Sequence, residues 1–260
     1  RMNMSFYSAA VGAIEQQKRL NVVSNNISNV NTYGFRAGKA AFGELMNRNV
    51  EGINGERLPK GTGTRVIQTT PNFNSAGYKD TGWPLDFAIE GDGFFALYDL
   101  ATEEVSFTRD GTFAMRRFEL PAEGEGEEPG EVWRLTDNQG RCVLNSEGNF
   151  IVMDPDNVRQ NSLDPDDQNI RQQDLDIGVF DYVVREGMQH LDKTRFQPTE
   201  QNGQLYQGTG RVKQGVLELS NTDLANEFIK MIESQRAYGI SLRMMTTTDE
   251  IETTINSLRG

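Results

Sequence analysis

Heptad-spaced apolar residues at both ends of the chain most constrain what this sequence can fold into. At the N-terminal end the spacing has Gln16 at one position and otherwise runs through Phe6, Ala9, Ala13, Leu20, Val23, Ile27 and Val30. Near the C-terminal end it runs through Leu224, Phe228, Met231, Gln235, Tyr238, Leu242 and Met245, and after a one-residue shift through Ile251, Ile255 and Leu258. We therefore predict one helix from Asn3–Ser5 to about Ser28 and another from Leu224 to near Gly260, paired with each other.

Between these ends the sequence changes to the alternating pattern of β-strands. Short runs such as Arg65–Thr70 and Gly93–Tyr98 are separated by turn-forming pairs such as Asp110–Gly111. The fold class is therefore α+β: a central antiparallel all-β domain, a small barrel or sandwich, flanked by amphipathic helices that pair as a coiled-coil-like axial domain. The expected parts are an N-terminal axial helix at 1–36, a connector at 37–63, the central β domain at 64–215, and a return segment with the C-terminal axial helix at 216–260. The axial domain is then discontinuous.

The composition excludes several classes of function. A net charge of -12 repels the phosphate backbone of nucleic acids, so we expect no nucleic-acid partner. Apolar residues make up only 36% of the chain, which suits a protein whose apolar stripes are buried by neighbouring molecules. No run approaches the length of a transmembrane helix, and the N-terminal residues lack the pattern of a cleavable signal peptide.

The two residue types that most often carry chemistry occur once each. Cys142 is the sole cysteine, so no intrachain disulfide can form, and we expect a small buried residue in a strand rather than a reactive thiol. His190 is the sole histidine, which excludes a His-rich metal site, and we expect it on the surface.

Two acidic stretches are predicted to be solvated loops rather than functional sites. The glycine-rich run at 123–131 is expected to be a solvated loop. The segment at 154–176 lacks the spacing and the glycine of an EF-hand, so a calcium site is disfavoured. A hydrolase with paired carboxylates such as Asp154 and Asp176 is also disfavoured, because acidic residues are so common here that chance pairing is expected.

A binding module is the alternative from a different class. A β domain for carbohydrate, dimerised by its helical ends, would need an aromatic platform, and Trp83 and Trp133 are available. Both tryptophans stand in strand-like or proline-bounded patterns, however, so we expect them to pack in the core.

Five stretches, in order along the chain, resemble the axial proteins of the bacterial flagellum, the rod and hook family. The first reads SNNISNVNTYGFR and is similar to the family pattern S-N-N-[IL]-A-N-[VA]-N-T-x-G-[FY]-[KR], with Ser28 in place of the usual alanine. The stretches are Ser24–Arg36, Thr81–Phe95, Phe107–Phe113, Gln214–Asn221, and Gln235–Tyr238 followed by Thr248–Glu250. The chain is too short for a hook protein, and it is most similar to the distal-rod type, with the proximal-rod paralogue as the alternative.

The resemblance implies a structural subunit and no enzyme, with no catalytic residue, metal, cofactor or small-molecule substrate. Such a subunit polymerises helically into the rod, the driveshaft that transmits torque and encloses the export channel. Its partners would be further copies of itself, other rod and hook axial proteins, and the flagellar type III export apparatus. Its location would be the basal body in the cell envelope and periplasm, reached without a cleaved signal peptide.

The residues expected at the assembly interface come from the two seams and from the asparagine-rich exit of the first helix. A seam rich in alanine, with Gln16 and Gln235 inside it, buries little area, so we expect the ends to order fully only when neighbouring subunits cover them. An ordinary intramolecular helix pair packed on the β domain is the alternative use of the seams. The expected interface residues are Phe6, Ala9, Ala13, Leu20, Val23, Asn25, Asn26, Ile27, Asn29, Val30, Gly34, Phe35, Leu224, Phe228, Met231, Gln235, Arg236, Tyr238, Leu242, Met245, Ile251 and Ile255.

Overall fold

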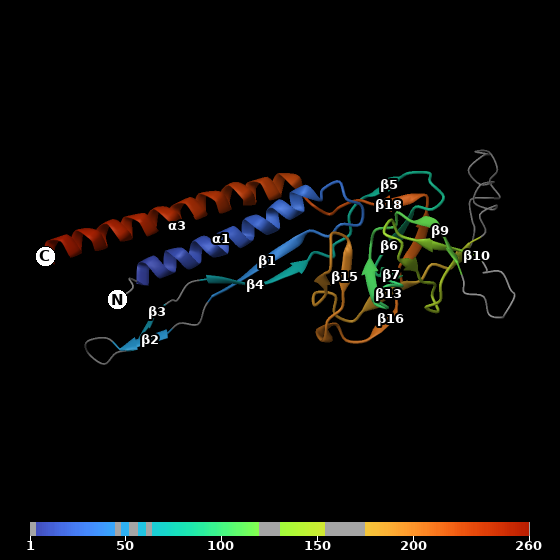
Figure 1. Ribbon diagram of the computed structural model, residues 1–260, viewed down its shortest axis with the longest axis horizontal. Coiled ribbons are helices and arrows are strands. Elements are labelled where there is room, and N and C mark those ends of the chain that lie inside the picture. Colours follow the sequence, from blue (N-terminus) through green and yellow to red (C-terminus); the bar gives the residue numbers. More distant parts are fainter. Residues whose placement is uncertain are drawn as a thin grey trace. The chain divides into compact units, whose positions relative to one another are not determined.

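The computed structural model describes residues 4–44, 48–51, 57–60, 64–119, 131–153 and 175–259 (Figure 1). The chain divides into two compact units. The helical unit comprises 1–30, 38–70 and 222–260, and the β unit comprises 31–37 and 71–221. The first and last parts of the sequence therefore belong to one unit.

The helical unit is built on two long helices, α1 (Met4–Ser28) and α3 (Leu224–Arg259). They lie side by side and antiparallel (Figure 1), and their ends confirm the helix boundaries predicted from the sequence. The Asp223 side chain caps α3 by accepting a hydrogen bond from the Asn226 backbone nitrogen at 3.2 Å. Strands β1 (Gly38–Glu44) and β4 (Thr64–Pro71) pair with each other, as do β2 (Arg48–Glu51) and β3 (Arg57–Lys60).

Among the described residues, the β unit contains a ten-stranded sheet and two separate strand pairs, and their strands pair antiparallel. The main path of the sheet is β12-β10-β11-β7-β8-β15-β14, with β9 on β10, β13 on β7 and β16 on β13. The strands of the sheet are β7 (Phe94–Tyr98), β8 (Val105–Thr108), β9 (Ala114–Glu119), β10 (Glu131–Thr136), β11 (Cys142–Val143), β12 (Val152–Met153), β13 (Val179–Tyr182), β14 (Gln189–His190), β15 (Arg195–Gln197) and β16 (Leu205–Gln207). The pairs are β5 (Tyr78–Asp80) with β18 (Val216–Glu218), and β6 (Phe87–Glu90) with β17 (Arg211–Gln214). The α+β class is thus confirmed, whereas the described strands form no closed barrel.

Strand β7 is the centre of the β unit because both of its faces are buried. Phe95 and Leu97 belong to one apolar cluster, and Phe94 and Ala96 belong to a second. Successive side chains of a strand point to opposite faces, so an unbroken apolar run can supply two cores. The sheet therefore carries packed side chains on both sides at this strand.

Several sequence-based expectations for single residues are corrected. Trp83 is 61% exposed, so the prediction that it packs in the core is wrong, whereas Trp133 does pack against the first apolar cluster. His190 is half-buried in β14 rather than a surface residue, because its ring lies between those of Phe35 and Phe196, with centroid distances of 6.3 Å and 4.9 Å.

Other expectations hold or fall outside the described chain. Cys142 is buried in β11, as predicted, and burial raises the pKa of its thiol. Strands β1, β2 and β3 lie in the part of the chain that the sequence indicates as a connector. The acidic run up to residue 130 and the Asp-rich segment up to residue 174 lie outside the described residues.

Candidate assembly surface

The two long helices meet through small side chains. A Cβ atom added at Gly12 of α1 would lie 3.4 Å from the Ser241 Oγ atom of α3, so the helices are close at this point. The buried Ser234 and Thr248 stand one heptad before and after Ser241, which places all three on one stripe of α3. The contact between α1 and α3 therefore buries little apolar area.

Most of the side chains that the sequence places at the α1 part of the interface are buried or half-buried within the subunit. Side chains of this set from the seam and from the exit of the helix are buried or half-buried, apart from Asn25. The buried ones are Ala9, Ala13, Val23, Asn26 and Asn29, and the half-buried ones are Phe6, Leu20, Ile27 and Val30.

The predicted positions of α3 divide into two groups. Met231, Tyr238 and Met245 are half-buried, whereas the exposed ones are Leu224, Phe228, Gln235, Arg236, Leu242, Ile251 and Ile255. The buried stripe runs one residue earlier than the predicted apolar series, with Ser234 before Gln235 and Ser241 before Leu242. One residue is a rotation of about 100° around a helix, so most of the large apolar side chains point away from α1.

Large apolar side chains consequently cover the outside of α3. Phe228, Ile232, Ile240 and Ile255 are between 50% and 59% exposed. Further exposed apolar side chains are Ile229, Met244 and Leu258 on α3, and Tyr7 and Ile14 on α1. Exposed apolar surface of this kind marks contact sites in soluble proteins.

Asn26 fixes the exit of α1 within the helical unit. Its side chain accepts a hydrogen bond from the Gly38 backbone nitrogen at 2.8 Å and donates to the Gly38 carbonyl at 3.0 Å. It also donates to the Glu227 carboxylate of α3 at 3.1 Å. A few residues further on, the Asn29 side chain donates to the Asn25 carbonyl at 2.9 Å. The asparagines of the exit therefore hold the chain reversal together inside one subunit.

A buried ion cluster fastens residues 31–37 within the β unit. The Arg36 Nη2 atom lies 2.6 Å from a Glu218 oxygen, and Arg109 Nη1 lies 3.3 Å from the other oxygen. All three side chains are at most 4% exposed. The Gly34 backbone nitrogen donates to the Glu218 carbonyl at 2.8 Å, and Phe35 is fully buried beside it. Burial lowers the pKa of Arg109, while the Glu218 carboxylate favours its charged form.

Asn221 joins the three chain segments at the boundary of the β unit. Its Oδ1 atom accepts from the Ala37 backbone nitrogen at 2.7 Å. Its Nδ2 atom donates to the carbonyls of Asn72 at 2.6 Å and Asn74 at 3.0 Å. Arg36, Arg109, Glu218 and Asn221 were missed as functional residues by sequence reasoning, although each stands in one of the motif stretches that carry the family resemblance.

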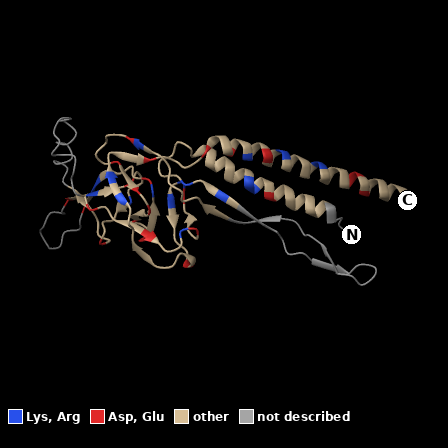
Figure 2. Cartoon of the chain, turned by 180° about the vertical axis from the view of Figure 1, so that it is seen from behind, with Lys and Arg blue, Asp and Glu red and all other residues tan. Residues whose placement is uncertain are grey.

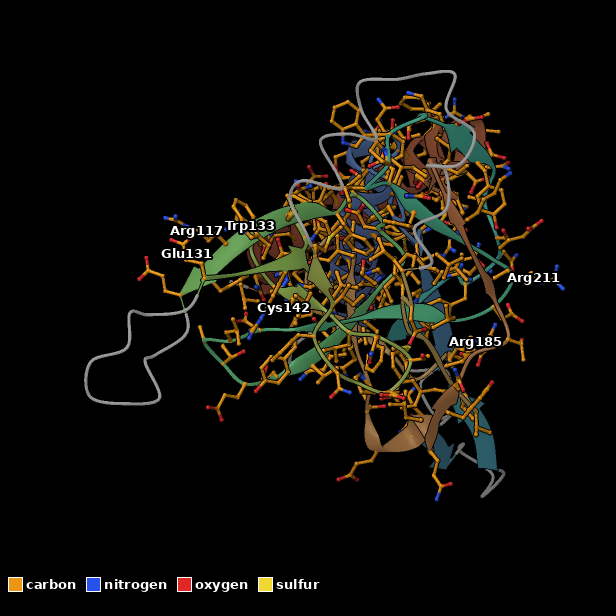
Figure 3. All side chains as sticks on the ribbon, turned by 90° about the vertical axis from the view of Figure 1, so that its right-hand side faces the viewer. Arg117, Glu131, Trp133, Cys142, Arg185 and Arg211 are labelled. Carbon is orange, nitrogen blue, oxygen red and sulfur yellow. The ribbon has the colours of Figure 1, made fainter. Side chains whose placement is uncertain are left out.

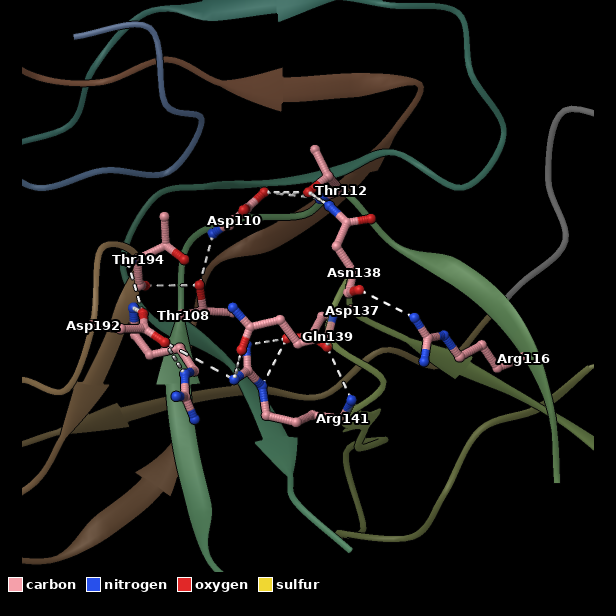
Figure 4. A network of polar contacts seen from close by, with 11 residues as sticks. Thr108, Asp110, Thr112, Arg116, Asp137, Asn138, Gln139, Arg141, Asp192 and Thr194 are labelled. Atoms are coloured by element: carbon pink, nitrogen blue, oxygen red, sulfur yellow. Dashed lines mark hydrogen bonds and ion pairs between the residues drawn. The ribbon is translucent and has the colours of Figure 1, made fainter. Parts of the chain in front are cut away.

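A polar groove of about 370 Å³ also lies in the β unit, and Figure 4 shows the network of polar contacts among its lining residues. In it Asp137 forms an ion pair with Arg141, and Asp110 accepts from the Thr112 hydroxyl at 2.7 Å. Burial raises the pKa of Asp110. The described residues contain no group of three or more His, Cys, Asp or Glu side chains suited to holding a metal ion.

These features define a class of protein: a structural subunit whose long terminal helices present apolar surface. No described helix is long and apolar enough to cross a membrane. The chain matches the family model described as "Flagella basal body rod protein" over residues 6–36 and the one described as "Flagellar basal body rod FlgEFG protein C-terminal" over residues 213–258. The two matched regions contain nearly all of α1 and of α3.

Full-length relatives agree with these models. The chain is 30% identical to the flagellar basal-body rod protein FlgG of Buchnera aphidicola subsp. Baizongia pistaciae, covering 95% of this chain and 96% of that one. It is 27% identical to FlgG of Bacillus subtilis, with 96% and 97% covered, and 28% identical to the rod protein FlgF of Mesorhizobium japonicum, with 95% and 94% covered.

The chain belongs to the flagellar basal-body rod protein family, and it is FlgG-like. It is accordingly a structural component of the flagellar rod and not an enzyme. The alternative of a carbohydrate-binding module finds no support in these relatives.

Proposed function

We propose that this chain polymerises helically into the rod through its helical unit, with the exposed apolar face of α3 as the main contact between copies. The observation that carries the proposal is the orientation of α3. Its small side chains, Ser234 and Ser241, are turned inward, while Phe228, Ile232 and Ile240 are at least half exposed. Full burial of one such side chain contributes about 1.5–3 kcal/mol, so a few of them per contact suffice to drive association.

The contact between copies must be heterologous. A face that meets a different face of the next copy repeats without closing and gives a filament or tube, whereas a self-complementary contact stops at a dimer. In such a tube the helical units pack against one another in a coiled-coil-like manner as the inner axial layer. The channel enclosed by this layer would be the export channel.

Assembly is proposed to complete the ordering of the helical unit. The contact between α1 and α3 is made by residues such as Ala13, Gly12 and Ser241, which bury little area. Neighbouring copies would supply the missing apolar contacts and so offset the entropy lost on ordering.

The rod so formed transmits torque along the flagellum and contacts other rod and hook axial proteins at its ends. Of the two rod types, we propose the distal one, on the basis of the stretch Gln235–Tyr238. We also propose passage through the type III exporter to the periplasmic part of the basal body. A chain with a single cysteine forms no intrachain disulfide, which suits export in an unfolded state.

The test removes apolar surface without changing the core. The variant Phe228→Ser/Ile232→Ser alters two exposed residues of α3, and the control Val183→Ser alters a valine of the β unit that is 70% exposed. We expect the wild type and the control to sediment as polymer above a critical concentration, and the α3 variant to remain monomeric at tenfold higher concentration. Polymerisation of the α3 variant at the wild-type concentration would overturn the proposal, as would a wild type that stays monomeric throughout.

A further inference from the structure

We propose that the C-terminal end of α3 in one subunit docks into a basic groove of the helical unit of the next copy. This inference rests on the proposed polymerisation and specifies one of its contacts. It combines three features of the helical unit: an overhang of α3, a groove at the other end of the helix pair, and complementary charge.

The overhang follows from the register of the two helices. Gly12 lies against Ser241, Arg19 pairs with Glu233, and Asn26 bonds to Glu227. In this antiparallel register Met4 is opposite a position near residue 249. The last ten residues of α3, 250–259, therefore extend about 15 Å past the start of α1 at 1.5 Å per residue, as Figure 1 shows.

The overhang is amphipathic and acidic. Ile251, Ile255 and Leu258 stand on one side of the helix and are 51%, 50% and 82% exposed. Between residues 249 and 259 the charged residues are Asp249, Glu250, Glu252 and Arg259, so acidic residues outnumber basic ones by three to one. A partner for this segment must therefore offer apolar contact together with positive charge.

A groove of about 360 Å³ at the other end of the helix pair has that chemistry. It lies among α1, β1 and the first turns of α3, and Val22, Val23 and Ala40 supply its apolar lining. Its charged lining is Arg19, Lys39, Lys230 and Glu227. Lys230 pairs with Glu227 at 2.6 Å and Arg19 pairs with Glu233 at 3.4 Å, so Lys39 supplies the net positive charge of the groove. Lys39 is exposed, and Figure 2 shows the basic positions of α1 and β1 and the acidic positions toward the C-terminal end of α3.

The placement of the two surfaces selects a second copy as the occupant. The groove surrounds Asn26 near the end of α1, whereas the overhang projects beyond its start, so neither can reach the other within one rigid helix pair. A contact between different faces of successive copies is heterologous and continues indefinitely. The charges would also fix the direction in which each copy is added.

The test is a charge swap in the full chain. We expect Lys39→Glu alone, and Glu250→Lys/Glu252→Lys alone, each to raise the critical concentration for sedimentation at least tenfold at low salt. The combination of the three changes should restore it to within about threefold of the wild type, because the attraction is re-formed with its signs exchanged. Lys213→Glu, which reverses an exposed lysine of the β unit, should have no effect.

The outcomes separate this inference from the proposed function. The docking contact would be overturned if the increases in critical concentration add up in the combined variant, or if the single variants assemble like the wild type. Neither result would contradict polymerisation itself. A wild type that does not sediment at all would overturn both. Circular dichroism of each monomeric variant at 222 nm must match the wild type, so that a lost fold is not mistaken for a lost contact.

Discussion

At the scale of single residues, the buried cluster around Glu218 is the feature on which the β unit most depends. Glu218 neutralises two arginines that are themselves buried, so its removal leaves two uncompensated charges. We predict that Glu218→Gln lowers the free energy of unfolding by about 3–5 kcal/mol. The measurement is urea denaturation of the monomer followed by tryptophan fluorescence.

An exposed ion pair provides the control for this prediction. Arg117 and Glu131 lie on the paired strands β9 and β10, 2.9 Å apart, with both side chains at least half exposed (Figure 3). Because water screens this pair, Glu131→Gln should cost at most about 1 kcal/mol. Equal losses in the two variants would contradict the special role of Glu218.

Gly34 is required both because its backbone has a positive φ and because it lies close to the backbone of Asp110. Its φ is 66°, and a Cβ atom there would overlap the backbone of Asp110. Gly82 has a φ of 65° but no heavy atom within 4 Å of the same added atom. We predict that Gly82→Ala costs about 1 kcal/mol, from backbone strain alone, and that Gly34→Ala costs several times more. Similar melting temperatures for the two variants would contradict this account.

His190 should give the β unit a pH dependence. Burial lowers the pKa of its imidazole below 6.5, although the Asp192 backbone and charge partly oppose this. The unfolded chain then binds the proton more readily than the folded one, so stability is full above pH 6.5 and falls as the pH drops through that value. We predict that His190→Gln is less stable than the wild type at pH 7.5 but loses less between pH 7.5 and pH 5.5. A parallel loss in both proteins, measured by urea denaturation, would contradict it.

At the scale of elements, the close contact of α1 with α3 depends on small side chains at the crossing. A leucine at Ser241 would meet Gly12 of α1, so Ser241→Leu should force the helices apart and cost about 1–3 kcal/mol. Ser257→Leu makes the same change at an exposed position of α3 and should cost less than about 0.5 kcal/mol. Thermal melting of the monomer followed at 222 nm measures both, and equal effects would show that the crossing tolerates bulk.

The elements also show how far the sequence could predict this fold. The extents of α1 and α3 followed from periodicity and caps, since both signals are local. The face of α3 that meets α1 could not be predicted in this way. Apolar spacing indicates which residues become buried, but it does not indicate whether α1 or a neighbouring molecule buries them. Phe228 and Leu242 of the predicted series are exposed, whereas Ser234 is buried and Ser241 is half-buried.

The candidate site was predictable to a smaller degree. The motif at Ser24–Arg36 located the important stretch, but the partners of Asn26 and Arg36 lie near the opposite end of the chain. No local pattern reveals that Glu218 accepts from both Arg36 and Arg109, because only tertiary folding brings these segments together. The exposure of Trp83 and the burial of His190 were mispredicted for the same reason.

At the scale of the whole molecule, the two units differ in where their large apolar side chains lie. The β unit carries the two described apolar clusters and the buried ion cluster around Glu218. The helical unit leaves large side chains such as Ile232 and Ile255 exposed. If copies assemble through the helical unit, assembly must stabilise the helical unit far more than the β unit.

Hydrogen–deuterium exchange of the monomer and of the polymer, read out by peptide mass spectrometry, tests this requirement most directly. We predict that peptides from α1 and α3 exchange at least tenfold more slowly in the polymer, while peptides from β7 and β8 exchange at the same rate in both. Protection gained in the β unit, with unchanged exchange in α1 and α3, would contradict assembly through the helical unit.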